Sequence, residues 1–303
     1  MPHDHHHHHH HHIPAEGGDR RLWLAIGVNF ALTLAQIVAG VISGSLALIA
    51  DAVHNLSDAV SLVLALVARR IARRPADAAM TFGYGRAEVV AALVNYTTLI
   101  VLSVWLAAEG IARLIEPEPV RGWIVVIVAG LALIVDSITA LLTLRMARDS
   151  VNIRAAFLHN LADALGSVAV IVAGTLILLY DWRLVDPLVT LGISAYILWH
   201  AGREVMPVIR ILMMGSPDEP GPEEVLQALR DLPGVVDVHH LHLWHMQEHE
   251  TALEAHIVQA DGQDDGLRLA VKSLLVDRFG IAHSVIEIEP EHAACEGVPA
   301  IGH

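Results

Sequence analysis

Six apolar segments, each close to the length that crosses a lipid bilayer, occupy most of the first 212 residues. They lie at about 22–42, 46–71, 88–112, 122–145, 155–180 and 185–212. About 20 apolar residues in a helix span the hydrocarbon core, and only structures that satisfy their own backbone hydrogen bonds are stable there. The chain is 54% hydrophobic with only 5% aromatic residues. We therefore expect a polytopic α-helical membrane protein with six transmembrane helices.

The arginines predict the orientation of these helices. Every loop that is rich in arginine falls on one side of the membrane if the six segments alternate in direction, and such loops are normally cytoplasmic. Both termini should then lie in the cytoplasm, and the protein should be a multi-pass protein of the inner (cytoplasmic) membrane. The arginine-rich side carries Arg20, Arg21, Arg69, Arg70, Arg73, Arg74, Arg86, Arg145, Arg148, Arg154, Arg203 and Arg210.

The sequence changes character after about residue 215, where acidic residues, proline and glycine replace the apolar runs. The pattern from there predicts a helix, two strands, a second helix and a third strand. That order is typical of a small ferredoxin-like α+β domain, which would gain stability from dimerisation. We expect a His-rich tail or tag at 1–20, a transmembrane domain at 21–213, a cytoplasmic metal-binding dimerisation domain at 214–292 and a C-terminal tail at 293–303.

Composition excludes some classes of function. The net charge of −14 argues against nucleic-acid binding and suits a protein that attracts cations. The single cysteine, Cys295, excludes an intrachain disulfide framework and any site with several cysteines. Eight consecutive histidines, His5 to His12, are either a purification tag or a natural metal-collecting tail.

A short motif occurs twice inside the apolar segments, as VHNLSDA at 53–59 and LHNLADA at 158–164. Each copy places a histidine four residues before an aspartate: His54 with Asp58, and His159 with Asp163. Residues four apart share one face of a helix. Ionisable side chains at membrane depth cost about 2.5–3.5 kcal/mol each on insertion scales and mark ion or proton pathways. Two histidines and two carboxylates form a tetrahedral set suited to Zn²⁺, although a histidine on an apolar helix is often only a hydrogen-bonded packing residue.

Other polar residues in the apolar segments allow two interpretations each. Asp51 lies seven residues before Asp58, near the same face, and is either a supporting or proton-carrying group or a structural one. Asp136 either joins helices by hydrogen bonding or takes part in transport. Asp186 stands before Pro187, and its position predicts that it caps the helix that begins there.

The C-terminal region is rich in histidine. Residues two apart share a face of a strand, so the HHLHLWH run cannot present all its histidines to one metal ion. Each of them by default is solvated or faces the core, but their number, together with Glu287 and Glu289, favours one or more metal sites. The histidines are His239, His240, His242, His245, His249, His256, His283 and His292.

Several motifs together resemble the cation diffusion facilitator family, close to its zinc-exporting bacterial branch. They are SLALIADAVHNLSDA, RPADAAMTFGYGRAE, AAFLHNLADALGS, DPL at 186–188 and DLPGVVDVHHLHLW. The resemblance implies a transport site made by His54, Asp58, His159 and Asp163. It also implies a cytoplasmic, dimer-stabilising metal site with His239, His256 and Glu289 as ligands and His283 as a fourth.

Some relatives bind a second metal in the loop between the second and third helices through an aspartate and two histidines. The matching positions here are Asp77, Met80 and Tyr84, so we expect that site to be absent or very weak. One family histidine in the helix of the cytoplasmic domain also has no equivalent, Arg268 being nearby.

The expected function is that of a homodimeric secondary transporter and not of an enzyme. It would export Zn²⁺, with Cd²⁺, Co²⁺ or Ni²⁺ as further candidates, in exchange for protons, with Zn²⁺ also a regulatory ligand and no organic cofactor. Two alternatives remain: a non-transporting membrane metal sensor or scaffold, and an intramembrane metalloenzyme, against which the absence of an HExxH motif argues.

Overall fold

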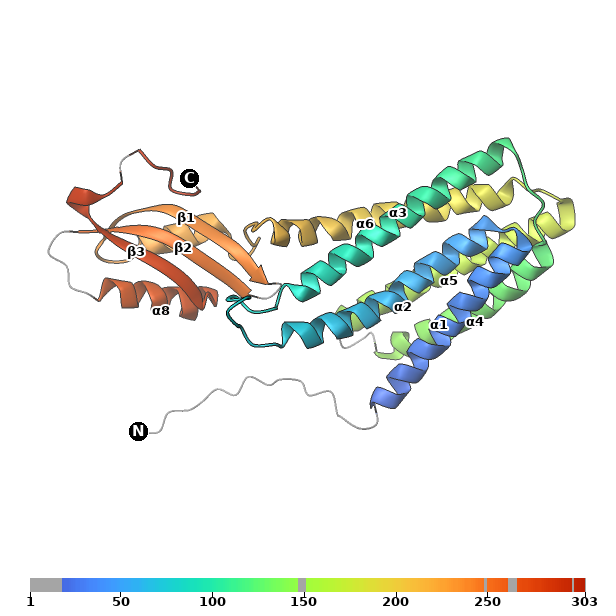
Figure 1. Cartoon of the computed structure of the whole chain (residues 1–303), viewed down its shortest axis with the longest axis horizontal. Helices are drawn as coiled ribbons and strands as arrows, with labels where there is room; N and C mark the ends of the chain where they lie inside the picture. Colours follow the sequence, from blue (N-terminus) through green and yellow to red (C-terminus); the bar gives the residue numbers. More distant parts are fainter. Residues whose placement is uncertain (1–17, 147–150, 248–249, 261–265, 296, 303) are drawn as a thin grey trace. The chain divides into compact units, whose positions relative to one another are not determined.

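Six long helices precede a small three-stranded sheet in the computed structural model (Figure 1). It describes the chain apart from residues 1–17, 147–150, 248–249, 261–265, 296 and 303, and apart from the side chains of 18–26, 28, 142–146 and 151–159. The histidine tract therefore lies outside the described residues. The helices are α1 (Gly18–Ser43), α2 (Leu46–Ala72), α3 (Ala87–Ile115), α4 (Gly122–Met146), α5 (Val151–Tyr180) and α6 (Val185–Leu212).

The chain divides into two compact units that share three of these helices. The first unit contains the described residues up to Leu62 together with Thr98–His200, and the second contains Val63–Thr97 and the described residues from Ala201 onward. In the first unit α4 packs along α5 and α1 packs against α4. Fully buried alanines lie at the helix contacts, where small side chains let two backbones approach closely. They include Ala47, Ala50, Ala52, Ala129, Ala132 and Ala173.

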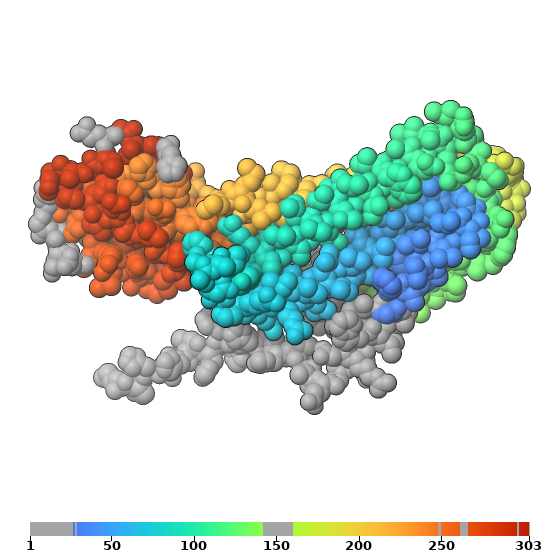
Figure 2. Space-filling view, viewed as in Figure 1, coloured from blue at the N-terminus to red at the C-terminus, as the bar shows by residue number. Residues whose placement is uncertain are grey.

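The outward faces of the helices are apolar, as lipid contact requires. Figure 2 shows α1 to α3, blue to green, at the surface of one face of the molecule. Large hydrophobic side chains remain exposed along α1, α3 and α4, which a water-facing surface would not tolerate over such an area. Examples are Leu34, Val38, Val101, Val104, Trp105, Leu131, Ile134 and Ile138.

Four described helices are long and apolar enough to cross a membrane: α2, α3, Gly122–Leu141 of α4 and Asn160–Tyr180 of α5. Within the described part of α1 the apolar stretch is the shorter Asn29–Ser43. Helix α6 has the length but also carries Asp186, His200, Arg203 and Glu204, which lower its hydropathy. A helical transmembrane domain is thus present, and the predicted count of six spans stays a prediction.

The link between α1 and α2 is the tight turn expected from Ser43-Gly44-Ser45. Gly44 has φ +78°, a left-handed conformation that a side chain disfavours. Arg113 on α3 donates from Nη1 to the Gly44 carbonyl oxygen at 2.5 Å, and the Arg121 amide donates to the Ser43 carbonyl at 2.8 Å. These bonds satisfy carbonyl groups that the end of a helix leaves without an intrahelical partner.

Asp186 caps a different helix from the one predicted. Its side chain is 1% exposed and accepts hydrogen bonds from Ser45 Oγ at 2.5 Å, the Leu46 amide at 2.8 Å and the Ala47 amide at 3.4 Å. The first amides of a helix have no intrahelical partner, and a carboxylate there also suits the helix dipole. Ser45 completes the cap by accepting from the Leu48 amide at 3.1 Å. The start of α6 is therefore tied to the start of α2.

The C-terminal elements follow the predicted order of helix, strand, strand, helix and strand. They are α7 (Pro222–Arg230), β1 (Val235–Gln247), β2 (Glu250–Gln259), α8 (Leu267–Phe279) and β3 (His283–Pro290), followed by the short 3₁₀ helix η1 (Glu291–Ala293). The sheet order is β1-β2-β3, with β1 and β2 antiparallel and β2 and β3 parallel. Apolar residues of α7 and α8 form one core with one face of the sheet.

Candidate metal centres

The intramembrane site lies where α2 and α5 present polar side chains to each other. On α2 the polar positions Asp51, His54, Asn55 and Asp58 recur at the spacing of one helix face. His54 Nε2 lies 3.1 Å from Asp163 Oδ1 on α5 and 3.9 Å from Asp58 Oδ2. These three residues offer ligand atoms that all lie within 4.8 Å of one another. Repeated motifs 105 residues apart therefore meet at one point, as the sequence predicted for three of the four residues.

His159 is the fourth member of the predicted set. Its backbone lies in α5, one helical turn before Asp163, but its side chain lies outside the described residues. His54 and Asp163 are buried, whereas the Asp58 side chain is about one-third exposed. Tyr196 of α6 packs edge-on against the His54 ring, with ring centroids 6.2 Å apart. A buried imidazole between two carboxylates has the donor chemistry that Zn²⁺ takes in proteins.

A second polar layer lies beside this site. Gln36 of α1, which is fully buried, donates from Nε2 to Asp51 Oδ2 at 2.9 Å. Ser167 Oγ lies 3.4 Å from Asp51 Oδ2 and 3.2 Å from Asp136 Oδ2. A hydroxyl donates only one hydrogen bond, so it cannot donate to both carboxyl groups at once. One of the two carboxyl groups must therefore carry a proton if both contacts are hydrogen bonds.

A bulge in β1 decides which residues reach the second candidate site. His239 pairs with His256, but the next pair is His242 with Glu254, so β1 has one extra residue there. His240 absorbs the change with φ +50°. As a result Val238 and Leu241, three residues apart, both join the core, and His239 faces the other side of the sheet.

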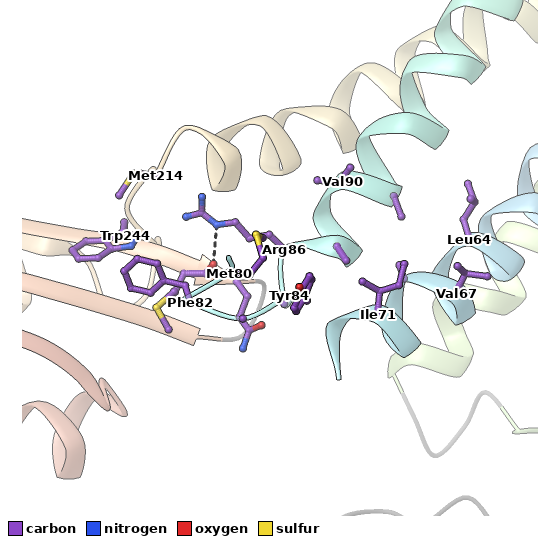
Figure 3. A pocket seen from close by; sticks show the side chains of 17 residues that line it. Leu64, Val67, Ile71, Met80, Phe82, Tyr84, Arg86, Val90, Met214 and Trp244 are labelled. Atoms are coloured by element: carbon purple, nitrogen blue, oxygen red, sulfur yellow. Dashed lines mark hydrogen bonds between the residues drawn. The ribbon is translucent and has the colours of Figure 1, made fainter. Parts of the chain in front are cut away.

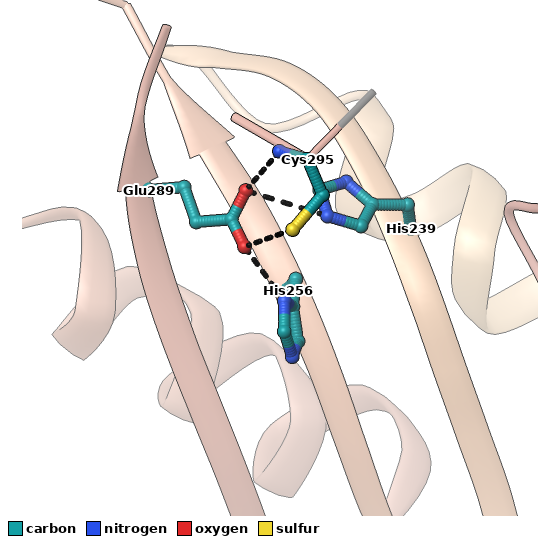
Figure 4. Close-up of side chains that lie close together, drawn as sticks. All are labelled: His239, His256, Glu289 and Cys295. Carbon is teal, nitrogen blue, oxygen red and sulfur yellow. Dashed lines mark hydrogen bonds and ion pairs between the residues drawn. The ribbon is translucent and has the colours of Figure 1, made fainter. Parts of the chain in front are cut away.

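The second site is on that outer face and joins three strands and the chain that follows them (Figure 4). His256 Nδ1 lies 2.7 Å from Glu289 Oε1, and His239 Nε2 lies 3.4 Å from Glu289 Oε2. The Cys295 amide donates to Glu289 Oε2 at 3.0 Å, and Cys295 Sγ lies 3.5 Å from Glu289 Oε1. The ligand atoms of His239, His256, Glu289 and Cys295 all lie within 4.8 Å of one another.

Hydrogen bonding keeps the carboxylate of this site ionised. Burial would raise the pKa of Glu289, but the Cys295 amide and His256 outweigh that effect and hold it below the usual value. Burial and the neighbouring Glu289 carboxylate raise the pKa of the Cys295 thiol. A metal ion would replace the thiol proton, because only the thiolate binds metals well.

The structure brings together three of the four cytoplasmic residues predicted as ligands and places the fourth elsewhere. His283 begins β3, six residues or about 20 Å of strand before Glu289. Its ring packs edge-on against Phe82 at 6.0 Å. Cys295 takes part in the group instead. The sequence argument missed it because it considered cysteine only as a member of sets of several cysteines.

The loop between α2 and α3 uses its aspartate for its own fold. Asp77 Oδ1 accepts from the Ala79 and Met80 amides, each at 2.8 Å, and Asp77 Oδ2 accepts from the Tyr84 hydroxyl at 2.7 Å. The Tyr84 hydrogen bond, helped by the two amides, lowers the pKa of the Asp77 carboxyl. These contacts occupy both oxygens of the only family-type ligand at the three positions.

The same loop docks on the end of β1 and, together with residues of α2, α3 and β1, lines an open apolar pocket of about 650 Å³ (Figure 3). Arg86 donates from Nε to the Met246 carbonyl at 2.9 Å and from Nη2 to the His245 carbonyl at 3.3 Å. A Cβ atom at position 85 would meet the flexible amide end of the Gln247 side chain, which would have to move aside. The motif RPADAAMTFGYGRAE thus forms a loop that is hydrogen-bonded to the end of β1.

Comparison with known proteins identifies the family to which this architecture belongs. Residues 22–213 match the profile described as the cation efflux transmembrane domain, and residues 217–291 match the cation efflux protein, cytoplasmic domain. The chain is a member of the cation efflux family. The resemblance drawn from the motifs is therefore confirmed, and the protein belongs to a family of membrane-spanning transporters of metal cations.

Curated relatives are similar over nearly the whole chain. The zinc transporter ZitB of Pectobacterium atrosepticum is 35% identical over 292 residues, which is 95% of this chain and 89% of that protein. The metal cation efflux system protein CzcD of Cupriavidus metallidurans is 33% identical over 95% of this chain and 91% of its own length. A protein of Bacillus subtilis named cadmium, cobalt and zinc/H(+)-K(+) antiporter is 30% identical over 91% of each chain.

Proposed function

We propose that the protein exports Zn²⁺ from the cytoplasm in exchange for protons through the site on α2 and α5. The observation that carries the proposal is the position of His54 Nε2, buried between carboxylates contributed by two helices. With His159 added from α5, the site would hold two imidazoles and two carboxylates. Imidazole favours Zn²⁺ and its neighbours Co²⁺ and Ni²⁺ over Mg²⁺, Ca²⁺ and Mn²⁺. The relatives named for zinc, cobalt and cadmium agree with this choice.

Protons and metal compete for the same groups. A metal ion needs neutral imidazole and ionised carboxylate, so binding releases protons and protonation releases the metal. Protonation of His54 and Asp163 on the outer side would discharge the ion. Asp51 and Asp136, bridged by Ser167, supply a place beside the metal where a proton can be held and moved.

The remaining parts of the proposal concern topology and assembly. All six helices cross the inner membrane with both termini in the cytoplasm, and α2 and α5 rock against the rest of the bundle to expose the site alternately. The cytoplasmic domain dimerises, as expected for a sheet with too small a core of its own. Zn²⁺ at His239, His256 and Glu289 acts there as a regulatory ligand.

Purified protein in proteoliposomes tests the transport proposal. Zn²⁺ added outside should enter the lumen while a trapped pH dye reports protons leaving. Both rates should rise when the lumen is made more acidic than the outside. Zinc movement with no proton movement would contradict the exchange. Liposomes without protein provide the control for passive leakage.

Replacing Asp51 by asparagine should separate proton movement from metal binding. The amide keeps the shape and can still bond Gln36 and Ser167, but it cannot take up a proton. We expect zinc affinity at the site to change less than about threefold and zinc-driven proton movement to fall at least about tenfold, a lower bound set below the roughly 100–10,000-fold that one positioned proton-transfer group typically contributes. Isothermal titration and the trapped dye measure the two quantities, and equal losses in both would instead assign Asp51 a structural role.

Replacing His54 by aspartate should change the metal preference. The variant site loses a nitrogen ligand and gains a carboxylate, which shifts it toward metals that favour oxygen. We expect Zn²⁺ affinity to fall at least about tenfold, the lower scale for loss of a group that supports a metal site, while Mn²⁺ affinity falls less or rises. Titration of both metals into wild type and variant measures the ratio, and an unchanged ratio would remove His54 from the ligand set.

A further inference from the structure

We infer that Cys295 is the fourth ligand of the cytoplasmic metal site, and that a bound Zn²⁺ fastens the C-terminal tail to the sheet. The inference extends the proposed regulatory site and is independent of transport. Its basis is the placement of a thiol, which the tail supplies, beside His239, His256 and Glu289 (Figure 4).

The group has the geometry of a site that contracts around an ion. Its four ligand atoms lie within 4.8 Å of one another. Tetrahedral Zn²⁺ with nitrogen at about 2.0–2.1 Å and sulfur at about 2.3 Å needs ligand separations of roughly 3.3–3.7 Å. Side-chain movements of about 1 Å would reach that arrangement. Cys295 is exposed, so an ion can reach the site from solvent.

His239 provides a second, independent indication. Its side chain is buried, the residue being only 3% exposed, and Nε2 makes no hydrogen bond within the part of the chain that the structure describes. The nearest oxygen, Glu289 Oε2, is 3.4 Å away. A buried imidazole nitrogen without a hydrogen bond is costly. An ion between His239, Glu289 and Cys295 would satisfy it.

The thiolate also selects the metal. Soft sulfur with imidazole favours Zn²⁺, Cd²⁺ and Co²⁺ over Mg²⁺, Ca²⁺ and Mn²⁺. One carboxylate and one thiolate balance the charge of a divalent ion. The site would therefore respond to the metals named for the relatives and ignore the abundant hard cations.

The tail beyond Cys295 already pairs with β1. The His240 amide donates to the Pro299 carbonyl at 3.2 Å, and the Leu241 amide donates to the Ala300 carbonyl at 3.0 Å. The Gly302 amide returns a hydrogen bond to the Leu241 carbonyl at 3.1 Å. A metal ion bound by Cys295 and by the sheet would hold the start of the tail, while the hydrogen bonds to β1 already hold its last residues.

The single cysteine makes the test specific. Co²⁺ bound by a thiolate gives a near-ultraviolet charge-transfer band, which neither the histidine tract nor the intramembrane site can produce because the chain has one cysteine. Titration of Co²⁺ into the full-length protein in detergent should raise this band to a plateau whose intensity corresponds to one thiolate-bound Co²⁺ per chain. The band should be absent in Cys295→Ser and fall at least about tenfold in His239→Ala, whereas His283→Ala, the matched control on β3, should keep it.

Thiol labelling and hydrogen exchange provide the second measurement. Zn²⁺ should slow maleimide labelling of Cys295 at least about tenfold in wild type but not in His239→Ala, and should slow amide exchange at 297–302 in wild type but not in Cys295→Ser. If metal binds at His256 and Glu289 with no charge-transfer band and no protection of the thiol, this inference is overturned while the proposed regulatory site stands. Loss of zinc transport in Asp163→Asn with the band intact would show that the two sites are separate.

Discussion

Replacing Asp163 by asparagine should reduce the zinc transport rate more than about 100-fold. Substitution of a group that only supports a metal ligand already costs about 10–100-fold, and Asp163 is itself the carboxylate nearest to His54 Nε2, at 3.1 Å. The amide keeps the volume but removes the charge that balances a divalent ion. Zinc flux into proteoliposomes, normalised to the amount of reconstituted protein, measures the effect.

Asp181→Asn is the matched control for this experiment. Asp181 follows the end of α5 and forms an exposed ion pair with Arg183, with Arg183 Nη2 2.9 Å from Asp181 Oδ2. The same chemical change there should leave zinc flux within about twofold of wild type, because exposed ion pairs contribute little. Asp163→Glu retains the charge and should recover part of the flux. If Asp163→Asn transports zinc at the wild-type rate, the proposed site is wrong.

The helical part of the architecture could be predicted because its physical signals are local. The expected segments agree with helices α1 to α6 within about four residues, and some of the apolar runs end at clear sequence signals such as Ser43-Gly44-Ser45 or Pro117 and Pro119. The pairing of His54 with Asp163 could also be predicted, because two copies of one motif at the same helical spacing have the same ligand geometry. The spacing of four residues also predicted that His54 and Asp58 share one face of α2, and that His159 and Asp163 share one face of α5.

Features that depend on contacts between distant residues could not be predicted in this way. The bulge between His239 and His242 changes the side of the sheet that each later residue of β1 faces. A prediction that places successive strand residues on opposite faces cannot include such an extra residue. Cys295 reaches His239 only because the chain turns back after η1. A pattern read along the sequence contains neither fact, so His283 was included and Cys295 was left out.

Asp186 illustrates the same limit and leads to the largest stability effect that we expect. A carboxylate before a helix normally caps that helix, and the sequence favoured this interpretation. The structure uses it to cap α2, 140 residues earlier, through the Leu46 amide. Sequence position alone cannot distinguish the two helices. Helices α2 and α6 begin side by side at the same end of the bundle, so Asp186 lies close to the first residues of both.

Asp186→Ala should destabilise the protein by at least about 3 kcal/mol. The change leaves the Leu46 and Ala47 amides and the Ser45 hydroxyl without their acceptor in a buried position, and each such group costs about 1–3 kcal/mol. On the scale for soluble domains of 150–250 residues this loss lowers the melting temperature by roughly 6–12 °C. Thermal unfolding in detergent, followed by tryptophan fluorescence or by loss of the monodisperse peak, measures it.

A double-mutant cycle with Ser45→Ala identifies the cause. Ser45 Oγ both donates to Asp186 and accepts from the Leu48 amide, so the two residues form one cap. If the cap is the source of stability, the double variant should be less destabilised than the sum of the single variants, because residues in one hydrogen-bond network are not additive. Asp181→Asn, at an exposed position in the loop before α6, should leave the melting temperature nearly unchanged, because asparagine also tolerates the φ of 51° at that residue. Strict additivity of Asp186→Ala and Ser45→Ala would mean that the two residues act separately, and a wild-type melting temperature in Asp186→Ala would show that the start of α2 does not need its carboxylate.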